Sequence, residues 1–240
     1  MKKWAILPDA HLETKASRPY SISKAWVKDY KPNGVILLGD YANVSALTHW
    51  DQDKRKKMEG KRHEREMKFV KQELRFLSDH CDEIIWILGN HEAWIEQYTE
   101  KHPEMTGLVE IENLIDLKSV NTKLITQDKM YKLGHCYFTH GFWTTKYHAN
   151  KHLTALGCNV VYGHTHRPQT DMLNMKMQKP IMAYGLGCLC DHGPSYLKNK
   201  PANWMCQVAE FLLDKGGNFS VIPHNIVDNK MIYNGKVYRG

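Results

Sequence analysis

The sequence predicts an α/β fold in which two packed β-sheets carry helices on their outer faces. In the first half of the chain, short apolar runs rich in β-branched residues alternate with amphipathic segments, as in parallel strands joined by helices. The second half holds mainly strand-like runs and hairpin turns. A third observation is that metal-binding side chains follow directly after five of the apolar runs, which is where α/β folds place their sites.

The first half of the chain is expected to contain three strands and three helices. The expected strands cover residues 3–8, 35–39 and 84–88. The first helix begins near Pro19, a favourable first-turn residue, and ends before Lys31. A long helix is expected over 54–78, because Met67, Val70, Leu74 and Leu77 form one apolar stripe, and a shorter helix is expected near 92–101.

The second half is expected to be richer in strands. A hairpin over 130–138 turns at Gly134-His135, and a helix over about 145–156 precedes a strand at 159–162. Further strands are expected at 180–184, 206–213 and 219–226, followed by a hairpin over 232–238 with an Asn-Gly turn. We interpret residues 1–240 as one domain, with 187–240 as a C-terminal loop and β-hairpin extension.

Composition restricts the class of protein. The chain has 240 residues, 42% of them hydrophobic, which is enough for a sizeable core. No apolar stretch approaches the roughly 20 residues of a membrane-spanning helix, and the first run stops at Pro8-Asp9, too early for a signal peptide. We therefore expect a cytoplasmic protein without a membrane partner. None of the six cysteines forms a C-x-x-C pair, so Cys188 and Cys190 are interpreted as core or loop thiols.

The net charge of +7 indicates an anionic partner. Much of the excess lies in residues 53–75, which hold ten Lys or Arg against five Asp or Glu. This segment is either a face that binds nucleic-acid phosphates or an ordinary solvated helix face with i,i+4 pairs such as Glu64–Lys68. The second interpretation is the simpler one.

Five polar segments carry the chemistry. They are Asp9-Ala10-His11, Gly39-Asp40, Gly89-Asn90-His91-Glu92, His140-Gly141 and Gly163-His164-Thr165-His166. Carboxylate, amide and imidazole donors suit borderline first-row metals, and the absence of thiolate from these segments argues against a structural zinc site. The glycines flank the ligands where sharp turns are expected.

In order and combination, these segments resemble the calcineurin-like metallophosphoesterases, in particular small stand-alone bacterial or phage-type members. The resemblance spans about residues 4–187, and Gly-Asn-His-Glu and Gly-His-Thr-His are its most specific parts. It implies a four-layer αββα sandwich of two mixed β-sheets flanked by helices. It also implies a dinuclear metal-dependent phosphoester hydrolase, a class that uses two divalent ions to make a nucleophile from water and to clamp the phosphoryl oxygens.

The resemblance assigns a role to each polar residue. One ion would be bound by Asp9, His11 and His166, and the other by Asn90, His140 and His164. Asp40 would bridge the two ions, and a hydroxide between them would attack phosphorus. His91 would be the general acid for the leaving oxygen, with Glu92 supporting its loop. Manganese is the expected metal, with iron, nickel, cobalt or zinc as alternatives.

The substrate is less defined by the sequence. Tyr41-Ala42-Asn43-Val44 replaces the Asp-Arg-Gly stretch of protein Ser/Thr phosphatases, which disfavours that branch. The basic charge favours a phosphodiester, either nucleic acid or nucleotide; the alternatives are a phosphomonoesterase acting on a small molecule or phosphoprotein, and a catalytically silent metal-binding scaffold. All seven expected ligands and His91 are present, which favours an enzyme. The oligomeric state stays open.

Three further groups of residues have less specific interpretations. Asn43 either binds substrate or caps its loop. His148 and His152, four apart on an expected helix, are interpreted as a polar helix face. The loop 187–204, which contains Asp191, His192, Tyr196, Lys198, Lys200 and Trp204, is expected to form part of the substrate rim.

Overall fold

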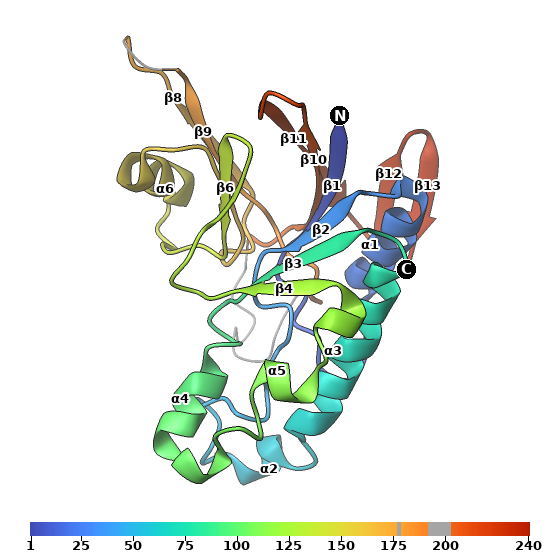
Figure 1. Ribbon diagram of the computed structural model, residues 1–240, viewed down its shortest axis with the longest axis vertical. Helices are drawn as coiled ribbons and strands as arrows, with labels where there is room; N and C mark the ends of the chain where they lie inside the picture. The colour runs from blue at the N-terminus through green and yellow to red at the C-terminus, as the bar shows by residue number, and fades with distance from the viewer. Residues whose placement is uncertain (177–178, 192–202) are drawn as a thin grey trace.

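The computed structural model describes residues 1–176, 179–191 and 203–240. Two mixed sheets pack face to face between helices (Figure 1). The first sheet has the strand order β11-β10-β1-β2-β3-β4. Its strands are β1 (Lys2–Leu7), β2 (Gly34–Leu37), β3 (Glu83–Ile87), β4 (Thr122–Ile125), β10 (Cys206–Leu213) and β11 (Phe219–Ile226). From β1 to β4 the strands are parallel, whereas β10 and β11 are antiparallel to their neighbours.

The second sheet has the order β5-β6-β7-β9-β8. Its strands are β5 (Tyr131–Leu133), β6 (Cys136–Thr139), β7 (Val160–Tyr162), β8 (Gln169–Leu173) and β9 (Ile181–Gly185). The three central strands are parallel, and β5 and β8 pair antiparallel at the edges. A separate hairpin joins β12 (Lys230–Tyr233) to β13 (Lys236–Arg239).

The helices lie on the outer faces and beyond one end of the sheets (Figure 1). They are α1 (Arg18–Tyr30), α2 (Arg55–Met58), α3 (His63–Ser78), α4 (Trp94–Lys101), α5 (Ile111–Leu114) and α6 (His148–Leu156), with 3₁₀ turns at Pro103–Met105 and Lys118–Val120. Ser17 caps α1 by accepting a hydrogen bond from the Tyr20 amide, and Pro19 lies in its first turn.

The central strands β1, β2, β3 and β7 are buried on both faces, which explains their nearly continuous apolar sequences. In β1, Trp4 and Ile6 point into the core between the two sheets, where Phe138 and Phe211 meet edge to face. Ala5 and Leu7 point the other way, into the core under α1 and α3. A third cluster packs α6 against β7 and β9. The layers therefore run helix, sheet, sheet, helix, which confirms the expected αββα sandwich.

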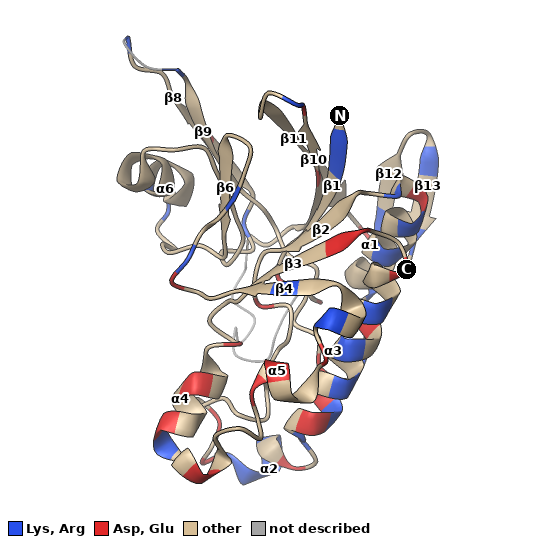
Figure 2. Ribbon diagram, in the orientation of Figure 1, with Lys and Arg blue, Asp and Glu red and all other residues tan. Residues whose placement is uncertain are grey.

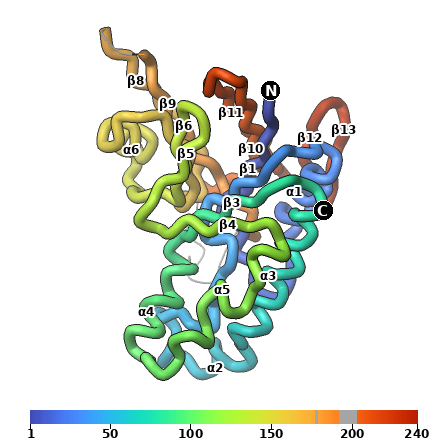
Figure 3. Tube along the Cα trace, in the orientation of Figure 1, coloured from blue at the N-terminus to red at the C-terminus, as the bar shows by residue number. Residues whose placement is uncertain are grey.

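The last part of the chain is built into the first sheet. β10 pairs with β1, so two strands from the ends of the sequence lie side by side near the centre of the sheet (Figure 3). Residues 206–226, which belong to the expected C-terminal extension, thus supply two of the six strands of the first sheet. The hairpin β12–β13 packs against α1, where Tyr238 donates a hydrogen bond to Asp29.

Several expected elements differ from the structure. The long helix predicted over 54–78 is wrong: it is divided into α2 and α3, because Gly60 lies in the left-handed region at φ 75° and Glu59 is extended. The strands β4 and β8 were not predicted. β8 is a half-exposed edge strand of mixed composition, so it has no apolar run to reveal it. No helix in the described parts of the chain is long and apolar enough to cross a bilayer.

The interpretation of His148 and His152 as a polar helix face is also wrong. Both are buried on α6 and lie against Tyr162, with His148 Nδ1 2.5 Å from the Tyr162 hydroxyl. The His152 ring stacks on Tyr162, accepts a hydrogen bond from the Phe142 amide and donates one to the carbonyl of His148. These two histidines are therefore hydrogen-bonded members of the core.

Candidate metal centre

The five polar segments converge where strands of both sheets end. β1, β2 and β3 end just before Asp9, Asp40 and Asn90, and β6 and β7 of the second sheet end just before His140 and His164. The turns after these strands are tight. Asp9, His11, Asp40, His164 and His166 all have positive φ angles, between 43° and 69°. Non-glycine residues avoid this region, so the surrounding structure must hold these backbones in place, as is common at functional sites.

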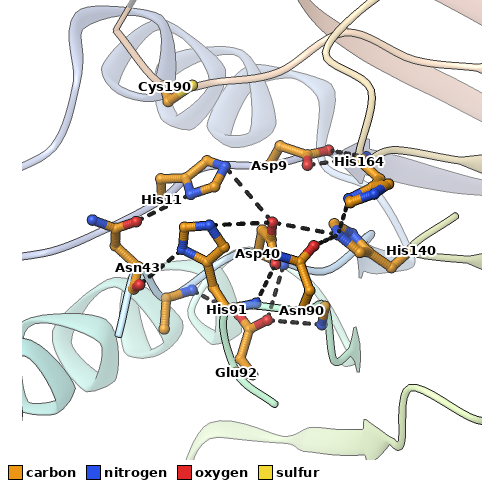
Figure 4. A network of polar contacts seen from close by, with 12 residues as sticks. Asp9, His11, Asp40, Asn43, Asn90, His91, Glu92, His140, His164 and Cys190 are labelled. Carbon is orange, nitrogen blue, oxygen red and sulfur yellow. Dashed lines mark hydrogen bonds and ion pairs between the residues drawn. The ribbon is translucent and has the colours of Figure 1, made fainter. Parts of the chain in front are cut away.

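The first group of candidate ligands consists of Asp40, Asn90, His140 and His164. The Nε2 atom of His140 lies 3.3 Å from Asp40 Oδ2 and 3.0 Å from Asn90 Oδ1 (Figure 4). His164 Nδ1 lies 3.1 Å from the same His140 nitrogen. Four donor side chains thus face one point, as expected for the second ion site.

The second group surrounds Asp9. His166 Nε2 lies 3.3 Å from Asp9 Oδ1 and 3.2 Å from His11 Nε2, which in turn lies 3.9 Å from Asp40 Oδ2. Asp40 therefore lies between the two groups, and its role as a bridging ligand, which the family resemblance implies, stays a prediction. Asp9, Asp40, His140 and His166 are buried, whereas His11, Asn90 and His164 are partly exposed.

The donor set fits divalent cations. Ring nitrogens lie close to one another beside the carboxylates, at 3.1 Å between His140 and His164 and 3.2 Å between His11 and His166. Burial by itself lowers the pKa of His140, but the adjacent Asp40 carboxylate outweighs it and raises that pKa to about 9. Burial likewise lowers the pKa of His166, but the hydrogen bond that its ring donates to the Asp9 carboxylate outweighs this and raises that pKa to about 10. Each carboxylate thus holds positive charge next to it, which a bound cation would supply.

The ring nitrogens that point away from the site have their own partners. His140 Nδ1 donates to the carbonyl of Leu38 at 2.8 Å, and His91 Nδ1 donates to the carbonyl of Asn43 at 2.9 Å. His11 Nδ1 lies 3.2 Å from the Asn43 side-chain oxygen. Such outer contacts fix the tautomer and direction of ligand rings.

Asn43 accordingly has a supporting position. Its side chain and carbonyl hold His11 and His91, and its amide nitrogen donates to Glu13 at 2.5 Å. It also lines the cleft above the metal centre, so the proposed contact with substrate stays a prediction.

Glu92 supports the loop, as its place after His91 suggested. Its buried carboxylate accepts hydrogen bonds from the amides of Gly89 (2.7 Å), Ala42 (2.9 Å) and Asp40 (3.0 Å) (Figure 4). One side chain therefore ties the loop after β2 to the loop after β3. Burial, reinforced by the nearby Asp40 carboxylate, raises the pKa of Glu92 to about 7.

Two glycines are required for close approach rather than for backbone angle. A Cβ atom on Gly89 would lie 2.2 Å from Asp40 Oδ1, and one on Gly163 would lie 2.2 Å from Asp9 Oδ2. Neither has a positive φ angle. The sequence indicated a turn at both places, and the structure shows instead that each leaves room for a ligand carboxylate.

His91 lies beside the bridging carboxylate, with Nε2 3.8 Å from Asp40 Oδ2. Burial lowers the pKa of His91 to about 4, although Asp40 opposes the shift. Since Nδ1 donates to Asn43, the neutral ring turns an unprotonated Nε2 toward the site. To act as a general acid, His91 would have to take up a proton at Nε2 when substrate binds.

Cys190 is a site residue that the sequence did not reveal. Its Sγ atom lies 4.0 Å from His166 Nδ1, and with His11 and His166 it forms a group able to hold a metal ion. Cys190 lies in the loop after β9, 24 positions along the chain from His166. No local sequence spacing could therefore indicate the contact. The interpretation of Cys190 as an ordinary loop thiol is therefore incomplete.

An open cleft of about 660 Å³ lies over these groups. His11, Asn90, His91 and His166 form part of its floor, and residues between Glu13 and Lys61 form one wall. Asp191 and Trp204, from the expected rim loop 187–204, line it as well. Residues 192–202 of that loop, which include His192, Tyr196, Lys198 and Lys200, lie outside the described residues.

Comparison with known proteins agrees with this geometry. The sequence matches the model of the calcineurin-like phosphoesterase family over residues 4–168, more than half of the chain. The chain belongs to this family. The matched residues include all five polar segments.

Solved structures show the same fold. Vps29 of Chaetomium thermophilum is 8% identical, with 100% of this chain and 99% of that one covered and a TM-score of 0.51. A double mutant of Vps29 from Entamoeba histolytica is 11% identical, with 98% and 95% covered and a TM-score of 0.51. At such low identity the likeness concerns the fold alone. A search of the curated proteins finds no significant match.

Proposed function

We propose that this chain is a dinuclear metal-dependent hydrolase that cleaves phosphodiesters. The observation that carries the proposal is the position of Asp40, a buried carboxylate between two groups of metal-binding side chains, of which His11, Asn90 and His166 line an open cleft. One group is Asp9, His11 and His166, and the other is Asn90, His140 and His164. Two bound divalent ions would supply a nucleophile from water at neutral pH and offset the charge of the phosphoryl group.

The chain's own residues would complete the reaction. Water adds to phosphorus, and the bond from phosphorus to the leaving oxygen breaks. His91 would donate a proton to that oxygen, since its Nε2 faces the site while Nδ1 is held by Asn43. The products are a phosphomonoester and an alcohol.

The donor set supports a borderline first-row metal. Imidazole, amide and carboxylate ligands suit manganese, iron, cobalt, nickel and zinc. Manganese is the first to test, although the Cys190 thiol near His166 and His11 would favour a softer ion at that position. All six cysteines are free, which suits the reducing cytoplasm as the place of action.

Two other functions are distinguished by the same experiment. A phosphomonoesterase would have the same metal centre, and a silent scaffold would keep the fold without turnover. The complete ligand set and His91 favour an enzyme over a scaffold. The open cleft favours a substrate that extends on both sides of the phosphate, as a diester does.

A substrate panel tests the proposal. The purified protein, loaded in turn with Mn, Zn, Co, Ni or Fe, would be given bis- and mono-p-nitrophenyl phosphate, cyclic nucleotides, and single- and double-stranded DNA. We expect diesters to be cleaved at least tenfold faster than monoesters, and the Asp40→Asn variant to be inactive. The reverse preference would identify a monoesterase. No turnover of any substrate with any metal would leave the scaffold as the better description.

A further inference from the structure

The cleft has an unusual wall for a site that binds only a small phosphoester. On the side of His91, the side chains that line it include the exposed Trp50 ring and the lysines Lys54 and Lys57. These come from the loop before α2 and from α2 itself, which lie beyond the sheets next to α4 (Figure 1). The metal centre does not need them, because all of its expected ligands come from the strand ends.

A row of four rings leads from the metal centre to the outside of the cleft. Trp94 lies against His91, with ring centroids 3.9 Å apart and planes tilted by 30°. His49 meets Trp94 edge to face at 6.1 Å, and Trp50 packs on His49 at 4.4 Å. The row ends at Trp50, whose side chain is 69% exposed. It therefore begins at the residue that faces the leaving oxygen.

Hydrogen bonds hold the backbone around Trp50. Lys54 Nζ donates to the carbonyl of Trp50 at 2.8 Å and to Asp51 Oδ1 at 2.7 Å. The Trp50 amide in turn donates to the Thr48 hydroxyl at 3.4 Å. A large exposed aromatic ring beside the cleft is a candidate surface for stacking.

The same wall carries positive charge. Asp51 pairs with both Lys54 and Lys57, at 2.7 Å and 2.5 Å, so this trio has one positive charge in excess. Lys61 pairs with Glu13 at 3.5 Å and adds none. Figure 2 shows α2 as basic, whereas acidic and basic residues mix along α3. Within the basic segment 53–75, the lysines that line the cleft are Lys54, Lys57 and Lys61, which lie in or next to α2.

We propose that this wall binds single-stranded nucleic acid, with an unpaired base on the leaving-group side stacked on Trp50 and the next phosphate paired with Lys57. The proposal rests on the proposed function and names its substrate. Stacking needs an exposed base face, which a duplex does not offer, and aromatic rings combined with lysines are the usual means of holding single strands. A free phosphomonoester would use neither Trp50 nor Lys57.

Kinetics with two matched oligonucleotides test the stacking. One is a short oligothymidylate, and the other has the same phosphates and sugars but no bases. We expect Trp50→Ala to raise KM for the oligothymidylate by about tenfold, with little change in kcat, and to leave KM for the abasic strand unchanged. Tyr147→Ala, which removes another exposed ring outside the cleft, should change neither. Equal effects of Trp50→Ala on both strands would overturn the proposal.

The charge is tested by the salt dependence of KM. Lys57→Gln should weaken the binding of both strands. It should also lower the slope of log KM against log salt by ~0.7, the contribution of one phosphate contact in a single strand. Its neighbour Lys56 does not line the cleft, so Lys56→Gln should behave as wild type. Identical slopes in the two variants would exclude Lys57 from phosphate binding.

Direct binding separates this proposal from the proposed function. Anisotropy of a labelled oligothymidylate, measured on the metal-loaded protein, needs no turnover. Tighter binding of the single strand than of the duplex, lost in Trp50→Ala, would support the site even in an inactive protein. Cleavage of bis-p-nitrophenyl phosphate without such binding would overturn the site while leaving the hydrolase intact. Stronger binding of the duplex would overturn it as well.

Discussion

At the scale of residues, His91 and the metal ligands are neighbours with separable roles. His91 faces Asp40, but its Nδ1 is engaged by Asn43, and it stacks on Trp94. We expect His91→Gln to reduce turnover by about 10²–10⁴-fold, the usual contribution of a general acid, while metal content measured by elemental analysis stays near two ions per chain. The partly exposed His102, which lies outside the site, serves as the control when replaced by Gln. Loss of one ion from the His91 variant would make it a ligand instead.

Glu92 does not face the substrate cleft, but its replacement should destabilise the loops that carry the site. Its two oxygens accept three backbone amides, and a glutamine at this position would turn an NH₂ group toward at least one of these donors. Glu92→Gln should therefore cost about 1–3 kcal/mol of unfolding free energy, measured by urea denaturation. The exposed Glu96→Gln on α4 should cost little. Equal stability of the two variants would show that Glu92 does not tie the loops together.

At the scale of elements, α6 carries a pH dependence in its buried histidines. Burial lowers the pKa of His148 to about 4, with Arg167 and His152 adding to the effect. The unfolded chain takes up this proton below about pH 6.5, whereas the folded chain resists it until about pH 4. Stability contributed by the neutral ring is thus complete above pH 6.5 and is lost as the pH falls toward 4. Thermal unfolding from pH 8 to pH 4 should show a shallower loss in His148→Asn than in wild type. Parallel curves would contradict this assignment.

The elements also show how far the sequence could be interpreted. Strands buried on both faces, such as β1 and β3, have continuous apolar sequences and were predicted within one or two residues. β8 was missed because an edge strand with alternate residues exposed has no such run. The prediction of one helix over 54–78 did not take account of Gly60, which has a positive φ angle that favours glycine and ends the helix. The residues of the candidate metal centre were indicated by local motifs and by the family resemblance, but Cys190 and the wall near Trp50 depend on tertiary contacts that no motif encodes.

At the scale of the whole molecule, the metal centre joins the two sheets. Asp9, Asp40 and Asn90 follow strands of the first sheet, whereas His140 and His164 follow strands of the second. Ions bound between them would therefore stabilise the packing of one sheet on the other, and only in the folded state. A ligand present at 100 times its dissociation constant adds about 2.7 kcal/mol to the free energy of unfolding.

Calorimetry should detect this coupling as a rise in Tm when manganese or zinc is added to metal-free protein. Because Asp40 contacts both groups of ligands, Asp40→Asn should abolish most of the rise for both ions, whereas Asp9→Asn should leave the part that comes from Asn90, His140 and His164. Exposed Asp53→Asn at the same ionic strength controls for general charge effects. An undiminished rise in Asp40→Asn would place the stabilising ions elsewhere, and partial loss equal to that in Asp9→Asn would show that Asp40 serves one ion rather than bridging two.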